Sequence, residues 1–182
     1  MQPRISIITI CYNAASTITR TLRSVSAQTY PNIQYLIIAG ASKDNTLELV
    51  RELAPEAEIY SERDKGIYDA MNKGLDRATG DYVWYVNAGD ALASPTTVED
   101  LVRATCTGDS LPDVLYGDTR LIDAEDHDLG LRRLRPPHQL DWRSFRSGML
   151  VCHQAFVAKR SISPHYDLSY RFSADVDWCI RV

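Results

Sequence analysis

The stretch Ser61–Asp90 reads SERDKGIYDAMNKGLDRATGDYVWYVNAGD, and it contains a loop, a helix, a turn, a strand and a carboxylate in that order. Over Gly66–Ala78, small and apolar residues recur at helical spacing, which predicts an amphipathic helix. The run Tyr82–Val86 is rich in β-branched and aromatic residues, as in a strand buried on both faces. It leads directly into Asn87–Asp90. The stretch therefore predicts a carboxylate at the edge where α/β sheets bind ligands.

Size and composition describe a soluble globular protein. The chain has 182 residues, which we interpret as a single domain, residues 1–182, with a full hydrophobic core. Apolar residues make up 45% and charged residues 24%, as in ordinary soluble domains. The net charge of −4 argues against bulk binding of nucleic acid. The chain stops at Val182 inside an apparent helix, so we expect a C-terminal part to be missing.

The cysteines and the apolar runs indicate a cytoplasmic protein. The four cysteines are widely spaced and form no CxxC pair. Cys11 and Cys152 lie in apolar runs, which favours buried free thiols over disulfides or zinc ligands. The sequence has no signal-peptide pattern and no apolar stretch of the roughly 18–20 residues that span a bilayer.

Strands and helices are predicted to alternate over the first half of the chain. We expect strands at residues 5–11, 34–38, 58–60 and 82–86, and helices at 14–27, 44–53 and 66–78. This alternation predicts an α/β fold with a mostly parallel sheet and helices on both faces. Gly80 is expected to end the third helix with a positive φ. A helix at 96–104 and strands at 114–116 and 119–122 should follow.

Familiar catalytic motifs are missing from the sequence. No GxGxxG follows the first strand, and the chain contains no GxxxxGK[ST], GxSxG or HExxH. The dinucleotide, P-loop, hydrolase and zincin interpretations therefore fail. What remains is a scattered set of carboxylates with one histidine, several of them after predicted strand ends: Asp44, Asp64, Asp90, His153, Asp175 and Asp177.

Several ordered motifs nevertheless resemble one family. They are Ser6–Asn13, Ala41–Thr46, Asp64–Gly74, Ala78–Asp81 and Asn87–Asp90, continued by His153-Gln154 and Ala174-Asp175. Together they resemble the family-two glycosyltransferases, and most closely the bacterial branch that builds capsules, exopolysaccharides and lipopolysaccharide. The resemblance covers nearly the whole chain.

The resemblance implies a fold and an activity. The fold is the Rossmann-like GT-A fold, a mostly parallel central sheet flanked by helices with a smaller antiparallel part on the acceptor side. Residues 1–90 would bind the nucleotide-sugar and residues 91–182 the acceptor. The implied activity is metal-dependent transfer of a sugar from a nucleotide donor, expected to be a UDP-sugar, onto a glycan or lipid-linked acceptor of the cell surface.

The resemblance also assigns the nucleotide contacts. In the family the first strand end, the end of the second strand and the Asp64–Gly74 region line the nucleotide. The residues expected there are Thr9, Tyr12, Asn13, Ala39, Asp64, Lys65, Lys73 and Asn87. Ala39 stands where the family usually has an aspartate that contacts the base, which weakens the expected donor site. The two lysines could bind phosphate, but exposed lysines on a polar helix face are mostly solvated.

Three residues would carry the chemistry. Asp90, joined by His153, matches the family's site for Mn²⁺ or Mg²⁺, which would neutralise the leaving diphosphate. Asp175 matches the family's base, which would take the proton of the acceptor hydroxyl. Asp177 competes for that role but is more typical of a helix-start charge. With one base and no evident second nucleophile, direct displacement with inversion is the simpler mechanism.

Each of these residues also has a purely structural interpretation. Asp90 could shape a turn or cap the helix near Pro95, and His153 could be a satisfied core histidine. Asp44 and Ser42 are better interpreted as caps of the second helix than as ligands. Asn87 and Gly89 leave a thinner acidic cluster than the family usually has.

The region 129–146 is rich in arginine and also holds Trp142 and Phe145. It is either a solvated loop whose arginine stems pack on aromatic rings, or a contact with a lipid-pyrophosphate acceptor at the inner face of the membrane. The second interpretation makes Arg132–Arg146 a peripheral membrane contact.

Two other functions stay open. The first is a catalytically silent homologue that binds sugar nucleotides as a partner subunit. The second, a sugar nucleotidyltransferase, is disfavoured because no glycine-rich loop with Arg and Lys follows the first strand.

Overall fold

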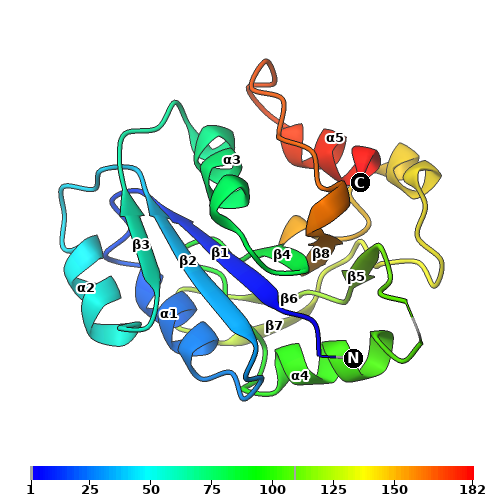
Figure 1. The fold of residues 1–182 in the computed structure, drawn as a ribbon, viewed down its shortest axis with the longest axis horizontal. Helices are drawn as coiled ribbons and strands as arrows, with labels where there is room; N and C mark the ends of the chain where they lie inside the picture. The colour runs from blue at the N-terminus through cyan, green and yellow to red at the C-terminus, as the bar shows by residue number, and fades with distance from the viewer. Residues whose placement is uncertain (1, 109) are drawn as a thin grey trace.

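A computed structural model describes residues 2–108 and 110–182 and shows a central sheet between two layers of helices (Figure 1). The sheet strands are β1 (Ile5–Cys11), β2 (Ile33–Ala39), β3 (Glu58–Ser61), β4 (Tyr82–Tyr85), β5 (Val114–Tyr116) and β8 (Phe156–Lys159). The helices are α1 (Ile18–Ser26), α2 (Thr46–Leu53), α3 (Ile67–Arg77), α4 (Thr97–Thr105) and α5 (Ala174–Arg181). A separate hairpin joins β6 (Arg120–Ile122) to β7 (Asp128–Leu131), and three short 3₁₀ helices are η1 (Trp142–Ser147), η2 (His153–Ala155) and η3 (Arg160–Ile162).

The strand order of the main sheet is β3-β2-β1-β4-β8-β5. The first four strands in this order are parallel, while β8 runs antiparallel to both of its neighbours. The chain moves outward from β1 to β2 and β3, and then crosses to the other side of β1 to form β4. The carboxyl ends of β1 and β4 therefore border the switch point at which such sheets bind ligands. The predicted mostly parallel α/β sheet is confirmed.

Alternate side chains of β1 enter two different cores. Ile7 and Cys11 pack with the buried faces of α1, α2 and α4, whereas Ile8 and Ile10 pack with those of α3 and α5. Every residue of β1 is buried. This is the pattern of a central strand covered by helices on both faces.

Gly80 does not have the positive φ that we expected. It lies instead against β1, where a Cβ atom would come within 2.6 Å of the Arg4 carbonyl oxygen and 2.8 Å of the Ser6 amide nitrogen. Close approach of two backbones is therefore the reason for glycine here.

Two strands were not predicted from the sequence. Strand β7 lies in the charged stretch after residue 120, and β8 follows the apolar run around Val151. The β6–β7 hairpin supplies the smaller antiparallel part expected from the family resemblance.

All four cysteines are free; Cys11, Cys106 and Cys179 are buried, and Cys152 is half-buried. Within the described ranges, no helix combines the length and apolar character that crossing a bilayer requires.

Candidate functional site

The loops after β1 and β2 are tied to each other. The Asn13 amide donates to Ser42 Oγ at 3.0 Å, and Asn13 Oδ1 accepts from the Lys43 amide at 2.8 Å. Asn13 adopts a left-handed φ of 47° and Ala41 one of 55°. Non-glycine residues with such φ values persist only where their surroundings hold them, and they cluster at functional sites.

Asp44 fastens the same two loops. Its carboxylate accepts from the Ala15 amide at 3.0 Å and from the Thr46 amide at 3.1 Å, at the start of α2. Hydrogen bonding, from the Thr46 hydroxyl above all, lowers the pKa of this carboxyl. Asp44 thus bonds at the start of α2 as a capping residue would, while the N-cap position itself is Asn45 and Ser42 bonds to the Asn13 amide instead.

Tyr12, Gly40 and Asp64 come together above the ends of β1 and β2. A Cβ atom on Gly40 would collide with the Asp64 carboxylate and would lie 3.2 Å from Tyr12 Cδ2. Asp64 Oδ1 accepts from the Gly66 amide at 3.0 Å, and the Tyr12 ring is exposed. An open aromatic face beside a carboxylate can stack a planar base and accept its N–H groups.

Two predicted contacts lie below the surface. The side chains of Thr9 and Ala39 are fully buried. Thr9 Oγ1 donates to the Val86 carbonyl at 2.7 Å, so this hydroxyl holds β1 against the end of β4. Their side chains therefore shape the strand ends and do not reach a bound nucleotide.

Lys73 is occupied as well. Its Nζ donates to the Arg63 carbonyl at 2.7 Å and lies 3.3 Å from the Asp69 carboxylate. It fastens the loop before α3 onto that helix, so its Nζ is engaged within the protein, and contact of Lys73 with the nucleotide stays a prediction. Lys65, in the same loop, is exposed, and its backbone amide donates to the Asp69 carboxylate.

The turn Asn87–Asp90 is held by a residue that the sequence reasoning missed. Thr21 is fully buried on α1; its Oγ1 accepts from the Gly89 amide at 2.9 Å and donates to the Asp90 carbonyl at 2.6 Å. Farther along α1, Ser24 Oγ accepts from the Leu92 amide, and Gln28, just past the end of the helix, bonds to Ser94 and Val98. Polar residues at i and i+3 on one face of the helix, Thr21 and Ser24, were the available signal.

Asp90 lines a cavity of about 520 Å³ between the end of β4, the segment before α4 and the β6–β7 hairpin. Burial raises the pKa of its carboxyl. It does not cap α4, whose N-cap position is Thr96. In the same turn, Asn87 Oδ1 is buried without a hydrogen-bond partner among the described residues. An unpaired amide oxygen and a desolvated carboxylate are oxygen donors that fit Mg²⁺ or Mn²⁺ when substrate phosphates supply further ligands.

His153 is placed in an aromatic cluster under α5. Its Nε2 lies 2.8 Å from Tyr166 Oη, and its ring lies 5.5 Å from the Tyr85 ring and 5.8 Å from the Trp178 ring. Burial lowers the pKa of His153 to about 4, so the ring is neutral at pH 7. These contacts match a satisfied core histidine. The pairing of His153 with Asp90 on one metal ion stays a prediction.

Asp175 lies in the first turn of α5, where Tyr68 Oη of α3 donates to its Oδ1 at 3.4 Å. Ser173, just before the helix, has a left-handed φ of 63°. The rival carboxylate, Asp177, is engaged by Arg181 at 2.7 Å, one turn along the same helix. Asp177 therefore behaves as a helix-start ion pair, and Asp175 is the carboxylate held by a hydroxyl from a facing helix.

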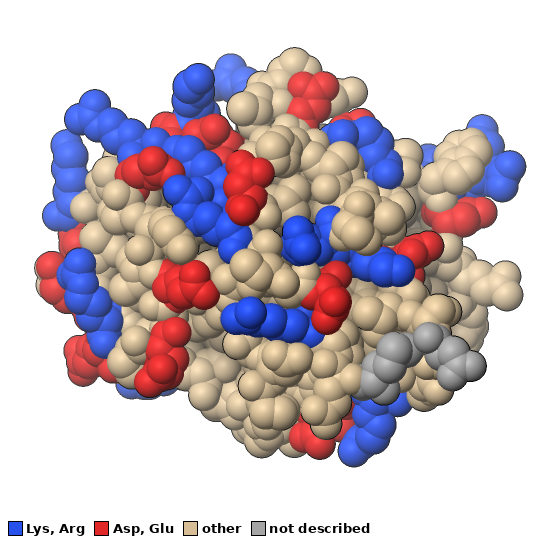
Figure 2. Space-filling view, viewed as in Figure 1, with Lys and Arg blue, Asp and Glu red and all other residues tan. Residues whose placement is uncertain are grey.

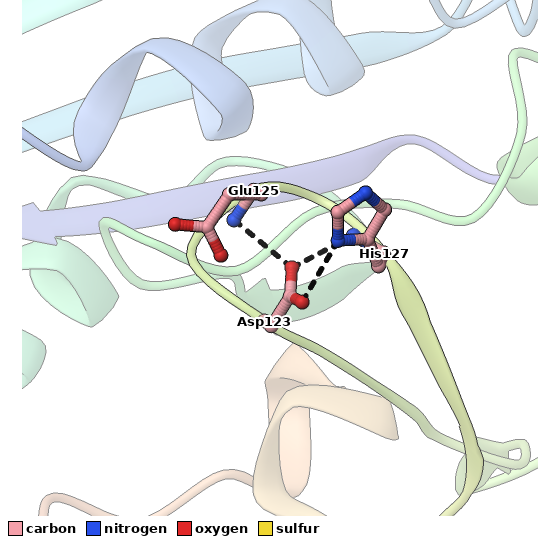
Figure 3. Close-up of side chains that lie close together, drawn as sticks. All are labelled: Asp123, Glu125 and His127. Carbon is pink, nitrogen blue, oxygen red and sulfur yellow. Dashed lines mark hydrogen bonds and ion pairs between the residues drawn. The ribbon is translucent and has the colours of Figure 1, made fainter.

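Another acidic group lies at the tip of the β6–β7 hairpin (Figure 3). Asp123, Glu125 and His127 bring ligand atoms within 4.8 Å of one another, and no other such group occurs within the described ranges. Asp123 Oδ1 accepts from the amides of Glu125 and His127, and its Oδ2 lies 3.0 Å from His127 Nδ1. These bonds close the turn, so the grouping is explained without a metal ion.

The arginine-rich stretch is only partly available for a partner. Arg132 Nη1 donates to the Met149 carbonyl at 2.7 Å. Arg135 forms a bidentate ion pair with the Asp118 carboxylate, with N–O distances of 2.5 and 2.6 Å. Arg143 lies over the exposed Trp142 ring. The range Arg132–Arg146 is therefore not one continuous contact surface, because its first arginines stabilise the fold.

Sequence comparison gives the class of protein. The chain matches glycosyl transferase family 2 over residues 6–165. It is 32% identical over 186 residues to an uncharacterised glycosyltransferase of Mycobacterium tuberculosis, covering 98% of this chain and 68% of that protein. Identity to a PGL/p-HBAD biosynthesis glycosyltransferase of Mycobacterium bovis is also 32%, over 188 residues, with 98% and 69% coverage. The chain belongs to glycosyl transferase family 2 and is a glycosyltransferase.

Solved structures agree on the fold. S. aureus TarS 1–349, crystallised with UDP-GlcNAc, superposes with a TM-score of 0.77 at 16% identity, covering 98% of this chain and 52% of that one. A mannosyltransferase from Pyrobaculum calidifontis, in complex with GDP-Man and Mn²⁺, gives 0.53 at 28% identity, covering 57% and 32%. The chain spans about half or less of these solved chains. The predicted GT-A fold is confirmed.

The matched relatives do not confirm the predicted capsule, exopolysaccharide and lipopolysaccharide branch. One of them is named for PGL/p-HBAD biosynthesis instead. The membership in family two is thus secure, and the finer assignment within it has to be argued from the site.

We predict that the Thr21 hydroxyl positions the turn that carries Asp90. In Thr21→Val, the Gly89 amide and the Asp90 carbonyl lose their partner in a buried place, which should lower the free energy of unfolding by about 1–3 kcal/mol. Thr21→Ser keeps the hydroxyl and is the matched control. Urea unfolding of the three proteins measures the difference. Equal stability of the Val and Ser variants would contradict this role.

Proposed function

We propose that this chain transfers a sugar from a nucleotide-sugar to a lipid-linked or glycolipid acceptor, with inversion at the sugar carbon. One observation carries the proposal: carboxylates follow the sheet in three places, with Asp64 against Gly40 and Tyr12 after β2 and β1, Asp90 in the turn after β4, and Asp175 in the first turn of α5, bonded to Tyr68 of α3. The name of the Mycobacterium bovis relative supports a glycolipid acceptor over a capsule polymer. In this scheme residues 1–90 hold the donor and residues 91–182 the acceptor.

The donor base would lie between Tyr12 and Asp64. The exposed Tyr12 ring offers a stacking face, and the Asp64 carboxylate accepts hydrogen bonds from a base that carries N–H donors. Uracil, thymine and guanine all carry such N–H donors. The UDP-sugar is the donor that the family resemblance implies, and we propose it on that ground. Because Ala39 provides no carboxylate, Asp64 would be the acidic group beside the base. Asn13 and Lys65 flank this position on the two neighbouring loops.

The diphosphate would lie along the turn Asn87–Asp90. Asn87 Oδ1 and the Asp90 carboxylate would hold a divalent cation together with donor phosphate oxygens. When bound, Mg²⁺ or Mn²⁺ would neutralise the negative charge that develops on the leaving diphosphate. The Thr21 hydroxyl keeps in place the turn that carries both oxygen donors.

Asp175 would act as the base. Tyr68 fixes the direction of its carboxylate, which can accept the proton of an acceptor hydroxyl as that oxygen attacks the sugar carbon. Asp177 is engaged by Arg181 and offers no second free carboxylate next to it. A single base and no covalent intermediate give inversion in one displacement.

The silent-homologue alternative rests on one observation. The end of β4 has Asn87 and Gly89 where the family usually has more acidic residues, which leaves Asp90 as the carboxylate of this turn. A silent homologue would bind the nucleotide but would show no turnover that depends on Asp175.

We predict that UDP binds this chain in a Mn²⁺-dependent manner and more tightly than GDP or dTDP. Calorimetric titration of each nucleotide with and without Mn²⁺ measures this. Asp90→Asn should abolish the effect of Mn²⁺, because the carboxylate ligand is lost. Asp123→Asn, in the acidic group at the hairpin tip, is the matched control and should bind as the unchanged protein does. Failure of all three nucleotides to bind would overturn the donor site.

We predict that Asp175→Asn lowers turnover by about 10²–10⁴-fold, the usual contribution of a general base. Release of UDP from UDP-sugars, in the presence of a panel of glycolipid acceptors, measures turnover. Affinity for UDP should stay unchanged, since Asp175 lies outside the base and diphosphate positions. Asp177→Asn is the control and should retain turnover. Equal turnover of the two variants would contradict Asp175 as the base, whereas UDP binding with no turnover in any of the three proteins would argue for the silent homologue.

A further inference from the structure

The β6–β7 hairpin is attached only loosely to the rest of the fold. Its strands pair with each other and not with the main sheet, and none of its residues, all of which are described, belongs to either hydrophobic core. All three residues of β6 are exposed, and in β7 only Gly130 is half-buried. A segment with few buried apolar contacts opens at a low cost in free energy. The position of the hairpin therefore depends on polar contacts.

One side chain of α1 holds the tip of the hairpin, which runs from beside β5 toward α1 (Figure 1). Arg20 Nη1 donates to the Asp123 carbonyl at 3.1 Å, and its Nη2 donates to the Ala124 carbonyl at 2.9 Å. The same Nη2 lies 3.1 Å from the Asp126 carboxylate. In the described parts of the chain, no other side chain outside the hairpin bonds to residues 123–127.

A surface ion pair alone would be weak evidence for such a role. Figure 2 shows basic and acidic side chains interspersed over one face of the protein, and exposed pairs of this kind contribute little to stability. Arg20 differs because it also bonds to two backbone carbonyls of the turn, and because its side chain is only 22% exposed. The planar fork of the guanidinium thus fixes the position of the tip and does not merely neutralise a charge.

The hairpin forms one wall of the cavity that contains Asp90, which we call the Asp90 cavity. Arg120, Ile122 and Asp128 line it from the hairpin, whereas Asp90 and Leu92 line it from the segment before α4. Arg120 Nε donates to the Asp128 carboxylate at 2.9 Å, so an ion pair joins the two strands of this wall. Outward movement of the hairpin would therefore open the cavity along one side.

Helix α1 holds both walls of the Asp90 cavity with adjacent residues. Thr21 bonds to the turn that carries Asp90, and Arg20 bonds to the hairpin tip. We infer that the β6–β7 hairpin is a lid over the Asp90 cavity and that Arg20 is the latch that holds it closed. Opening the lid breaks the contacts of one arginine and no contact of either core. Such an opening is of the size that ligand-binding lids undergo.

The latch is a feature of the protein without ligand and does not depend on the proposed function. What the lid encloses does rest on that function, because Asp90 would hold the cation and the donor diphosphate. A closed hairpin would then shield this part of the donor from water. Arg20 is a positioning residue in this scheme, since it bonds to the hairpin and not to the substrate.

Amide hydrogen exchange tests the latch. A detached two-stranded hairpin is marginally stable in water, so Arg20→Gln should speed exchange over residues 120–131 by about tenfold or more. Exchange in β1 and β4 should not change. Arg23→Gln is the matched control on the same helix, because Arg23 is exposed and its side chain forms no bond within residues 2–108 and 110–182. Equal hairpin exchange in the two variants, or faster exchange throughout the Arg20→Gln chain, would overturn the latch.

Asp126→Asn tests the same contact from the hairpin side. Asparagine tolerates the left-handed φ of 66° at this position, so only the charge is lost. This variant should speed hairpin exchange less than Arg20→Gln does, because both carbonyl bonds remain. Combined with Arg20→Gln, it should add nothing further, since the two residues share one interaction. Fully additive effects would show that Arg20 and Asp126 act separately and would contradict the latch.

A bound ligand should keep the lid closed. In the unchanged protein, Mn²⁺ with UDP should slow hairpin exchange, and Mn²⁺ alone is the control because the acidic group at the tip has ligand atoms of its own (Figure 3). Equal slowing by Mn²⁺ alone, or no slowing in protein to which UDP is bound, would overturn the lid while the donor site stands. If UDP does not bind, the donor site and the lid over it both fail, and the variants still decide the latch.

Discussion

The complete burial of β1 is the constraint on which the rest of this structure depends. All seven residues of the strand pair with β2, while β4 pairs on its other side and helices cover both of its faces. The strand order reverses at β1, because β2 and β4 pair on opposite sides of it, and such sheets bind ligands beyond the carboxyl ends of the strands at that point. The candidate site is placed at this reversal, so its expected position follows from the strand order and not from any one motif.

The loops around this site are held by hydrogen bonds to backbone groups. Asp44 and Asn13 join the loops after β1 and β2, and Thr21 holds the turn after β4. In the proposed scheme Asp44 and Thr21 contact no substrate, whereas Asn13 also flanks the position of the base. They keep the turns in conformations, including left-handed φ at Asn13 and Ala41, that an isolated chain would rarely adopt. A site built in this way is ordered before the ligand arrives, which lowers the entropic cost of binding.

Much of the fold could be predicted from sequence, because hydrophobic periodicity is a local signal. The strand at residues 5–11 and the alternation of strands and helices up to residue 90 are confirmed. Strand β8 was missed because its partners β4 and β5 lie far from it in the sequence. Strand β7 is a short, mostly exposed strand that pairs with the neighbouring β6. Their sequences carry no strong alternation of their own.

Within the site, sequence order identified the loops better than the side chains. Tyr12, Asp64, Asp90 and Asp175 do lie on the predicted loops and helix start. Thr9 and Lys73 instead form hydrogen bonds within the protein. The Thr9 hydroxyl donates to the buried Val86 carbonyl, and the Lys73 ammonium group donates to the Arg63 carbonyl in the loop before α3. Such pairings join residues that lie far apart in the chain or across a loop. Neither motif spacing nor periodicity reveals them.

The most direct test of the account is a crystal structure of this chain with UDP and Mn²⁺. The account predicts that the uracil lies between Tyr12 and Asp64 above Gly40, and that the diphosphate follows the Asn87–Asp90 turn. Asp175 should face the open side of the diphosphate, where the sugar would be attached. A nucleotide bound away from the switch point, for example beside Arg135 at the β5 edge, would contradict the central claim that the three carboxylate loops form one site.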